Sequence, residues 1–244
     1  MVVLLDVQGL TKSFGGLTAV KGLTFSVREG EIIGFIGPNG SGKTTAFNLI
    51  TGLLTPDGGH IWLAGEEITA FRPHAICAKG IARTFQLVKP FAHLSALHNV
   101  MVGRIYGREP VAGLAVAASQ ARETLAFVGL GGKEQVEARR LTLVDRKRLE
   151  LARALATRPR LLLLDEFMAG LNPQEVQTAM ALIRRIRETG PAVVMIEHIV
   201  MAVMGVSDRV IVLSAGQAIA EGPPEAVARD PKVIDAYLGG AGVA

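Results

Sequence analysis

Short apolar runs separated by glycine- and proline-containing turns divide this chain into predicted strands and helices. Near the N-terminus, apolar and polar residues alternate over Leu4–Val7 and Leu23–Val27, which is typical of strands that bury one face. Ile32–Ile36 and Leu161–Leu164 are almost continuously apolar, which is typical of strands buried on both faces of a parallel sheet. The pattern therefore predicts strands of two kinds, with a further strand pair over residues 59–68.

The second half of the chain is predicted to mix helices and strands. From Ser95 to Leu155 the pattern is helical, rich in Ala, Leu, Arg and Glu, with a break at Gly129–Gly132. Beyond it, helices and strands alternate over Pro173–Thr189, Ala192–Ile196, Ile199–Gly205 and Arg209–Leu213. Such alternation indicates a wound α/β sheet, in which ligands gather at the carboxyl ends of the strands.

A glycine-rich segment between a predicted strand and a predicted helix carries the clearest chemical signal. Gly37–Thr45 fits G-x-x-x-x-G-K-[ST], and the helix expected over Ala46–Leu53 follows it. Glycines let successive backbone N–H groups turn toward one anion, and the helix N-terminus adds its N–H groups and dipole. The lysine supplies a charge for the outer phosphates, and the threonine after it can join a Mg²⁺ shell. The alternative is a glycine-rich turn that binds nothing. We expect phosphates to be held by Gly37, Pro38, Asn39, Gly40, Ser41, Gly42, Lys43, Thr44 and Thr45.

Carboxylates and a histidine follow two further predicted strands. Asp165 and Glu166 end the leucine-rich strand; because neighbouring strand residues point to opposite sides, one can support Mg²⁺ while the other faces the attacking water. His198 can hydrogen-bond the γ-phosphate or that water, although a lone histidine at a strand end is more often structural. The amide of Gln86, at the start of the helical region, can reach Mg²⁺ or water; without this context it would be read as a surface residue.

Composition narrows the class of protein. Of the 244 residues, 49% are hydrophobic, yet no apolar run reaches the roughly 18 residues that a membrane span needs. No signal peptide is recognisable, so we expect a cytoplasmic protein held at the membrane through partners. The net charge of +4 is mild, and the basic clusters Arg139-Arg140 and Arg146–Arg148 are read as a solvated helix face rather than a nucleic-acid site. Cys77 is the only cysteine and is read as structural.

Taken in order, these elements resemble the ATP-binding subunit of an ABC transporter over essentially the whole chain. The resemblance implies one P-loop NTPase domain, residues 1–244, of the α/β class. It has a mostly parallel core sheet, an N-terminal antiparallel β subdomain and an inserted α-helical subdomain at about 87–155. The matching segments are the phosphate loop, the glutamine loop at Gln86, a signature at 141–145, Leu161–Glu166, the loop Ala169–Asn172 and the His198 switch.

The resemblance also implies roles for individual residues. ATP and Mg²⁺ would be the cofactors, with Lys43, Glu166 and His198 as catalytic residues. Phe14 would stack on adenine, unless it is a core residue, and Thr142 of the signature would contact nucleotide. The metal ligands would be Thr44, Gln86 and Asp165.

Within the family, the chain is most similar to importers of branched-chain or other hydrophobic amino acids. The segments that carry this similarity are Ser13–Val20, Arg83–Gln86, Ala169–Pro173, Ile196–His198 and Ala236–Gly239. Subunits for urea, amide or lipopolysaccharide transport share several of them and remain alternatives, as does a regulatory or other non-transport nucleotide binder. The implied partners are a second ATPase subunit, two membrane permeases and, indirectly, a periplasmic or extracellular substrate-binding protein. The chain would lie on the inner face of the cell membrane. Nucleic acid is not an expected partner.

The sequence departs from the family pattern in the signature. Leu141–Asp145 reads Leu-Thr-Leu-Val-Asp where the family has Leu-Ser-Gly-Gly-Gln or close to it. The branched side chain of Val144 would obstruct close approach to the backbone. If the position needs positive φ, a β-branched residue there costs about 1–2 kcal/mol or more. Asp145 adds a negative charge that Arg146 and Lys147 can offset. We therefore predict an asymmetric heterodimer, in which the site completed by this signature is weak. Phe167, where proline is common, is a second departure.

Overall fold

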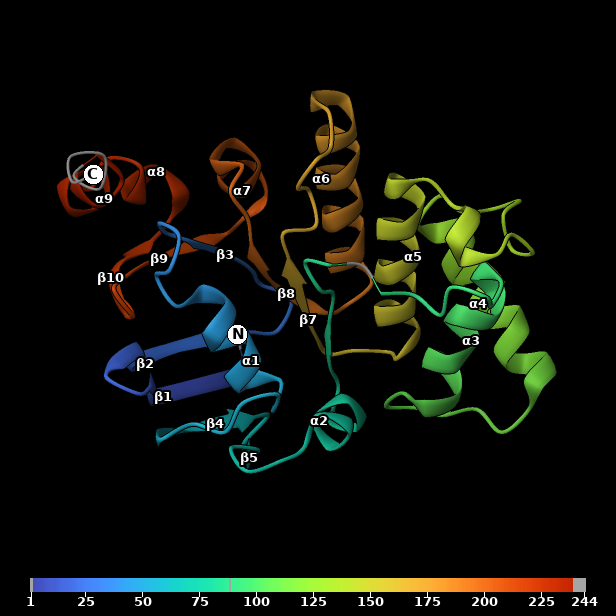
Figure 1. Cartoon of the computed structure of the whole chain (residues 1–244), viewed down its shortest axis with the longest axis horizontal. Helices are drawn as coiled ribbons and strands as arrows, with labels where there is room; N and C mark the ends of the chain where they lie inside the picture. Colours follow the sequence, from blue (N-terminus) through green and yellow to red (C-terminus); the bar gives the residue numbers. More distant parts are fainter. Residues whose placement is uncertain (1, 88, 239–244) are drawn as a thin grey trace. The chain divides into compact units, whose positions relative to one another are not determined.

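The computed structural model describes residues 2–87 and 89–238, and the chain divides into two compact units (Figure 1). The first unit comprises the residues up to Pro73 and those from Met168 onward; the second is His74–Phe167. Gly239, which belongs to one of the segments compared above, and Val88, at the start of the expected helical subdomain, lie outside the described residues.

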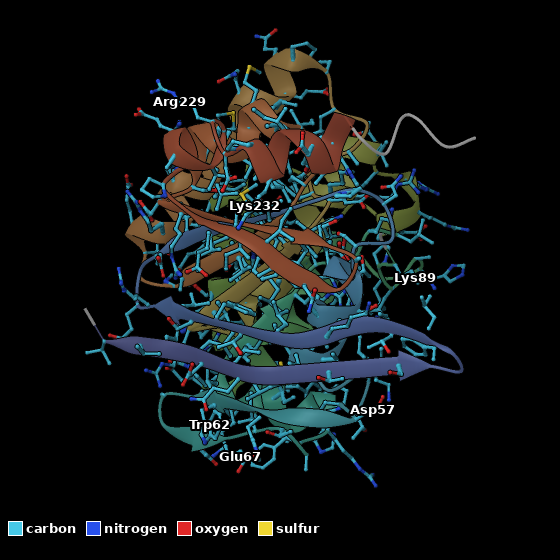
Figure 2. The ribbon with its side chains drawn as sticks, turned by 90° about the vertical axis from the view of Figure 1, so that its left-hand side faces the viewer. Asp57, Trp62, Glu67, Lys89, Arg229 and Lys232 are labelled. Carbon is cyan, nitrogen blue, oxygen red and sulfur yellow. The ribbon has the colours of Figure 1, made fainter. Side chains whose placement is uncertain are left out.

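The first unit contains the expected N-terminal antiparallel sheet, whose strands run in the order β2-β1-β4-β5. These strands are β1 (Val3–Phe14), β2 (Leu17–Arg28), β4 (Gly58–Leu63) and β5 (Glu66–Glu67). Both N-terminal strands are longer than their apolar alternation suggested, because several register shifts let the pair continue past the regular pattern. Figure 2 shows the two long strands side by side, with Trp62 and Glu67 on the neighbouring β4–β5 edge.

A second group of strands in the first unit builds the buried parallel layer. β3 (Ile32–Ile36) pairs in parallel with both β8 (Ala192–Ile196) and β9 (Arg209–Ser214), and every residue of β3 and β8 is buried. β10 (Gln217–Gly222), which the apolar pattern did not reveal, pairs antiparallel to β9. The helices of this unit are α1 (Lys43–Ile50), α6 (Pro173–Glu188), α7 (Val200–Val206), α8 (Pro224–Val227) and α9 (Pro231–Leu238).

The second unit joins a short parallel strand pair to a group of helices. β6 (Ile81–Arg83) runs parallel to β7 (Leu161–Asp165), with Ile81 opposite Leu161. The predicted helical stretch is broken twice rather than once, because Gly107–Gly113 also separates helices. The helices are α2 (Pro73–Lys79), which begins at the last residue of the first unit, then α3 (Ala96–Tyr106), α4 (Leu114–Phe127), the 3₁₀ turn η1 (Ala138–Arg140) and α5 (Leu143–Ala156). None of the helices in the described part of the chain is both long and apolar enough to cross a bilayer.

Candidate nucleotide site

The phosphate loop connects β3 to α1 and depends on glycine at two positions. Gly37 has φ 147°, and a Cβ there would lie 2.0 Å from the carbonyl oxygen of Leu213. Gly42 is the N-cap of α1 with φ 101°, and a Cβ there would lie 2.4 Å from the carbonyl oxygen of Ala19. The left-handed N-cap starts α1 at Lys43, three residues earlier than the apolar pattern indicated. This geometry places Lys43 and Thr44 in the first turn of the helix.

Lys43 is buried inside the loop that it belongs to. Its ammonium group donates to the carbonyl oxygens of Gly37 and Pro38, at 2.8 and 2.9 Å, and to the Ser41 hydroxyl at 3.2 Å. The first turn of α1 receives no side-chain cap, whereas α3, α5 and α6 are capped by Ser95, Thr142 and Asn172. An uncapped helix N-terminus beside a lysine is the arrangement that anionic oxygens favour.

Phe14 lies at the end of β1 and is 48% exposed, so it is not a core residue. The Lys12 ammonium lies 5.8 Å from the centre of its ring. Asp57 holds this strand end by accepting from Lys12 and from the Ser13 backbone, both at 2.7 Å, and Figure 2 shows it beside the end of β1. An exposed aromatic ring on a strand end that Asp57 holds in place is suited to stacking on a base.

His198 is exposed just beyond β8, in the same unit as the phosphate loop and Phe14. Its neighbour Glu197 is buried, and the Glu197 carboxylate accepts the backbone N–H of Met168 at 2.6 Å. Met168 opens the segment that leads to Asn172. Sequence reasoning took Glu197 only as part of a matching segment; its structural role shows only once the fold brings residues 168 and 197 together.

Asp165, in the second unit, is buried at the end of β7. One carboxylate oxygen, Oδ2, accepts from the Arg83 guanidinium at 2.6 Å, and the Asp165 backbone N–H donates to the Thr84 hydroxyl at 3.2 Å. Within the described part of the chain, the other oxygen, Oδ1, is buried and has no hydrogen-bond partner. A buried carboxylate oxygen with unused lone pairs needs a compensating donor or cation, so the residue fits a magnesium shell.

Glu166 and Gln86 are brought together by the parallel pairing of β6 and β7. The Gln86 side-chain amide donates to Glu166 Oε2 at 2.7 Å. Glu166 has φ 50°, a left-handed backbone conformation that costs a non-glycine residue about 1–3 kcal/mol. Such strain concentrates at functional sites, and here it falls on the residue expected to activate water.

The signature segment satisfies its own polar groups. Thr142 caps α5 by accepting the Asp145 N–H at 3.2 Å, and Lys133 donates to the Asp145 carboxylate at 2.5 Å. Burial pushes the pKa of Asp145 up, but the bonds from Lys133 and Thr142 outweigh it and leave the pKa below its ordinary value. Lys133 therefore offsets this charge and Arg148 adds to the effect, whereas the sequence had suggested Arg146 and Lys147. Val144 has helical backbone in the first turn of α5, so its β-branched side chain meets no positive φ.

Two further residues near these sites had not been identified as functional candidates from the sequence. Tyr237 of α9 makes a hydrogen bond with the backbone of Gly37, and burial raises the pKa of its phenol despite that bond. Glu150 of α5 is buried and accepts the Phe85 N–H at 3.1 Å. No local motif marks either residue as functional, because each makes its contact with a segment that is distant in the sequence.

Burial raises the pKa of Glu150 to about 7, against the opposing effects of the Phe85 N–H, Arg153 and Lys147, while Asp165 adds to the rise. The folded chain therefore holds this proton more tightly than the unfolded chain, whose value is 4.5. We expect the free energy of unfolding of the native chain, relative to Glu150→Gln, to fall as pH rises from about 4.5 to about 7. Urea unfolding of the native chain and of Glu150→Gln across this pH range measures the difference in free energy of unfolding. Glu123→Gln, at an exposed position, is the control. A difference between the native chain and Glu150→Gln that does not vary with pH would contradict the prediction.

Comparison with known proteins shows the family to which the chain belongs. Residues 20–169 match the family model described as ABC transporter, and residues 219–243 match the model described as branched-chain amino acid ATP-binding cassette transporter. The chain is 42% identical to the high-affinity branched-chain amino acid transport ATP-binding protein BraF of Pseudomonas aeruginosa, with 97% of this chain and 98% of that protein covered. It is 35% identical to the lipopolysaccharide export system ATP-binding protein LptB of Acidithiobacillus ferridurans, over 98% of both.

Solved structures show the same fold. A crystal structure of the ADP conformation of an ATP-binding cassette of an ABC transporter superposes with a TM-score of 0.88 at 30% identity, covering 98% of this chain and all of that one. The fold and the phosphate loop together define an ATP-hydrolysing nucleotide-binding cassette, and the expected fold class is confirmed. The chain belongs to the ABC transporter family, and within it to the ATP-binding subunits of the branched-chain amino acid transport type.

Proposed function

We propose that this chain hydrolyses ATP to power the import of branched-chain or other hydrophobic amino acids. The observation that carries the proposal is the identity of 42%, along nearly the full length, with a relative named for high-affinity branched-chain amino acid transport. The match of residues 219–243 to the branched-chain model supports it independently, because this segment lies outside the general ABC match.

The candidate residues have separate proposed roles in ATP binding and hydrolysis. Lys43 and the first turn of α1 bind the phosphates, and Phe14 stacks on adenine. Thr44, Gln86 and Asp165 hold Mg²⁺, which when bound neutralises charge on the transferred phosphoryl group. The metal role of Asp165 is supported by its buried, unpartnered Oδ1. Glu166 takes the proton of the attacking water.

His198 contacts the γ-phosphate side of the site, as its exposure at the end of β8 allows. The chain acts as one ATPase domain, residues 1–244, with a helical subdomain at about 87–155 that receives the membrane subunits. It works beside a second ATPase subunit, on the inner face of the cell membrane, with two permeases and a substrate-binding protein outside. Lipopolysaccharide export is the second candidate, favoured by the 35% identity to a protein of that name.

Transport by the reconstituted complex tests the proposal. The chain, its second ATPase subunit and the permeases are placed in vesicles, the binding protein is added on the side opposite the ATPase subunits, and uptake of labelled leucine, urea or acetamide is followed with Mg-ATP. We expect ATP-dependent leucine uptake and little uptake of the other two. Uptake of urea or acetamide in place of leucine would overturn the assignment of cargo, and no ATP-dependent uptake of any solute would favour the export function.

We further propose that the composite site completed by this chain's signature is weak. The Thr142 hydroxyl hydrogen-bonds to Asp145, and the Asp145 carboxylate also accepts from Lys133. Leu143 presents a half-exposed apolar side chain in the first turn of α5. The helical backbone at Val144 brings no strain, but a β-branched side chain in the first turn of α5 is bulkier than the glycine that the family has there, and we expect it to hinder the approach of a phosphate to the backbone N–H groups.

Val144→Gly is expected to strengthen that site. In a Glu166→Gln background, which silences this chain's own site, the residual ATPase rate of the complex should rise several-fold, about three or more. Steady-state phosphate release measures the rate. Val116→Gly, at an exposed position near the start of α4, is the matched control for the cost of a helical glycine. No increase, or an equal increase in the control, would show that Val144 is not what weakens the site.

A further inference from the structure

Helix α5 carries three ionisable side chains at intervals of three residues, Lys147, Glu150 and Arg153, which brings them toward one side of the helix. Lys147 and Glu150 are buried. Burying an ionisable group is costly unless it is hydrogen-bonded, so each of these contacts is expected to be specific. All three reach backbone atoms of two loops within the second unit.

Lys147 holds the backbone around Glu166. Its ammonium donates to the carbonyl oxygen of Glu166 at 3.3 Å and to that of Phe167 at 3.0 Å. Glu166 has the left-handed φ of 50°, which persists only where the surroundings enforce it. The buried Lys147 ammonium, bound to the carbonyl oxygens of Glu166 and Phe167, is a contact that can enforce this backbone conformation.

Glu150 and Arg153 hold the glutamine loop on either side of Gln86. The Glu150 carboxylate accepts the Phe85 N–H at 3.1 Å, and the Arg153 guanidinium donates to the Lys89 carbonyl at 3.1 Å. Gln86 lies between these points, and its amide reaches Glu166 at 2.7 Å. Side chains of α5 therefore hydrogen-bond to the backbone at Glu166 and to the backbone on both sides of Gln86.

We propose that Lys147 and Glu150 are positioning residues that set the geometry of the Gln86–Glu166 pair for ATP hydrolysis. They act through the backbone of Glu166 and of the loop that carries Gln86, the two residues proposed to contact the attacking water and Mg²⁺. The inference rests on the proposed role of Glu166. Because the signature residue Thr142 caps α5, the same helix links the signature of one proposed composite site to the glutamate of the other.

The test uses the assembled transporter with Lys147→Met, Glu150→Ala and Gln86→Ala. For each single variant we expect kcat to fall about 10- to 100-fold, because small displacements of a catalytic group are costly. For Lys147→Met and Glu150→Ala, KM for ATP should stay within about twofold, since the phosphate loop holds ATP through other residues. Glu123→Ala, exposed on α4, is the control that should change neither.

A double-mutant cycle distinguishes positioning from general damage. If Glu150 acts through Gln86, adding Glu150→Ala to Gln86→Ala should cost little more, less than about threefold; independent effects would multiply and overturn the proposal. Glu150→Gln keeps an acceptor for the Phe85 N–H and should recover most of the loss. If Glu150→Ala does not fold, Glu150→Asp replaces it. The shorter side chain moves the carboxylate away from the Phe85 N–H, so the same fall in kcat is expected.

The outcomes also separate this inference from the proposed function. If Glu166→Gln abolishes hydrolysis while Lys147→Met and Glu150→Ala keep native kcat, the positioning roles are wrong and the catalytic role stands. If Glu166→Gln leaves hydrolysis intact, the catalytic role itself is wrong, and the positioning proposal falls with it.

Discussion

Replacing Glu166 with Gln is expected to lower the ATPase rate at this chain's own site about 10²- to 10⁴-fold while ATP still binds. The amide has the shape of the carboxylate, and its oxygen can still accept the Gln86 bond of 2.7 Å, so the site keeps its geometry and loses only its base. Single-turnover hydrolysis and equilibrium ATP binding by the assembled transporter measure the two effects separately. Glu123→Gln, exposed in the same unit, is the control.

The same substitution also tests whether the two sites are unequal. Because this chain's signature satisfies its own polar groups, the equivalent change in the second ATPase subunit should cost the complex far less than Glu166→Gln costs it. Equal losses from the two substitutions would count against asymmetry. Full activity after Glu166→Gln would remove Glu166 from the catalytic residues altogether.

Replacing Lys43 with Ala is expected to weaken ATP binding about 10- to 100-fold, the scale of one charge-assisted hydrogen bond. The loss has two sources, because the ammonium is expected to contact the outer phosphates and also donates to Gly37, Pro38 and Ser41 within the loop. Isothermal titration of the chain with Mg-ATP measures the affinity, and thermal unfolding without nucleotide measures the loop contribution.

A matched control separates the local role of Lys43 from the loss of one positive charge. Lys232→Ala removes the same charge from an exposed position in the same unit (Figure 2), and it should leave ATP affinity unchanged. If Lys43→Ala binds ATP as tightly as the native chain, the loop does not hold phosphates as proposed. If both variants weaken binding equally, the effect is one of net charge.

The strands and the phosphate loop were predictable because their signals are local. Ile32–Ile36 and Ala192–Ile196 are apolar throughout, and each forms the strand that its pattern indicates. Asp165, Glu166 and His198 were chosen as candidates because each lies at or just beyond the end of such an apolar run. The edge strand β10 and the short β6 were missed, since neither has an apolar run long enough to distinguish it from a loop.

The start of α5 and the environment of its signature were less predictable. The apolar pattern indicates only a helical stretch that ends at Leu155, whereas the Thr142 hydroxyl caps α5 and sets its start at Leu143. Lys133 reaches Asp145 from a separate loop. Propensity and charge along the sequence do not reveal a salt bridge between residues 12 positions apart. The suggestion that Arg146 and Lys147 offset Asp145 therefore failed for Lys147, whose ammonium instead binds two carbonyls after β7.

The sequence by itself determined the class of this protein, because a phosphate loop needs its glycines, lysine and flanking strand and helix in one continuous segment. It also pointed to the side chains at the strand ends for which we propose chemical roles. Only the tertiary structure decided how Glu166 is held: by Gln86, from a loop 80 residues away, and by Lys147, from a helix that opens with the signature. Hydrogen bonds to backbone atoms impose almost no requirement on the residue type that receives them, so the sequence bears no trace of them before the chain is folded.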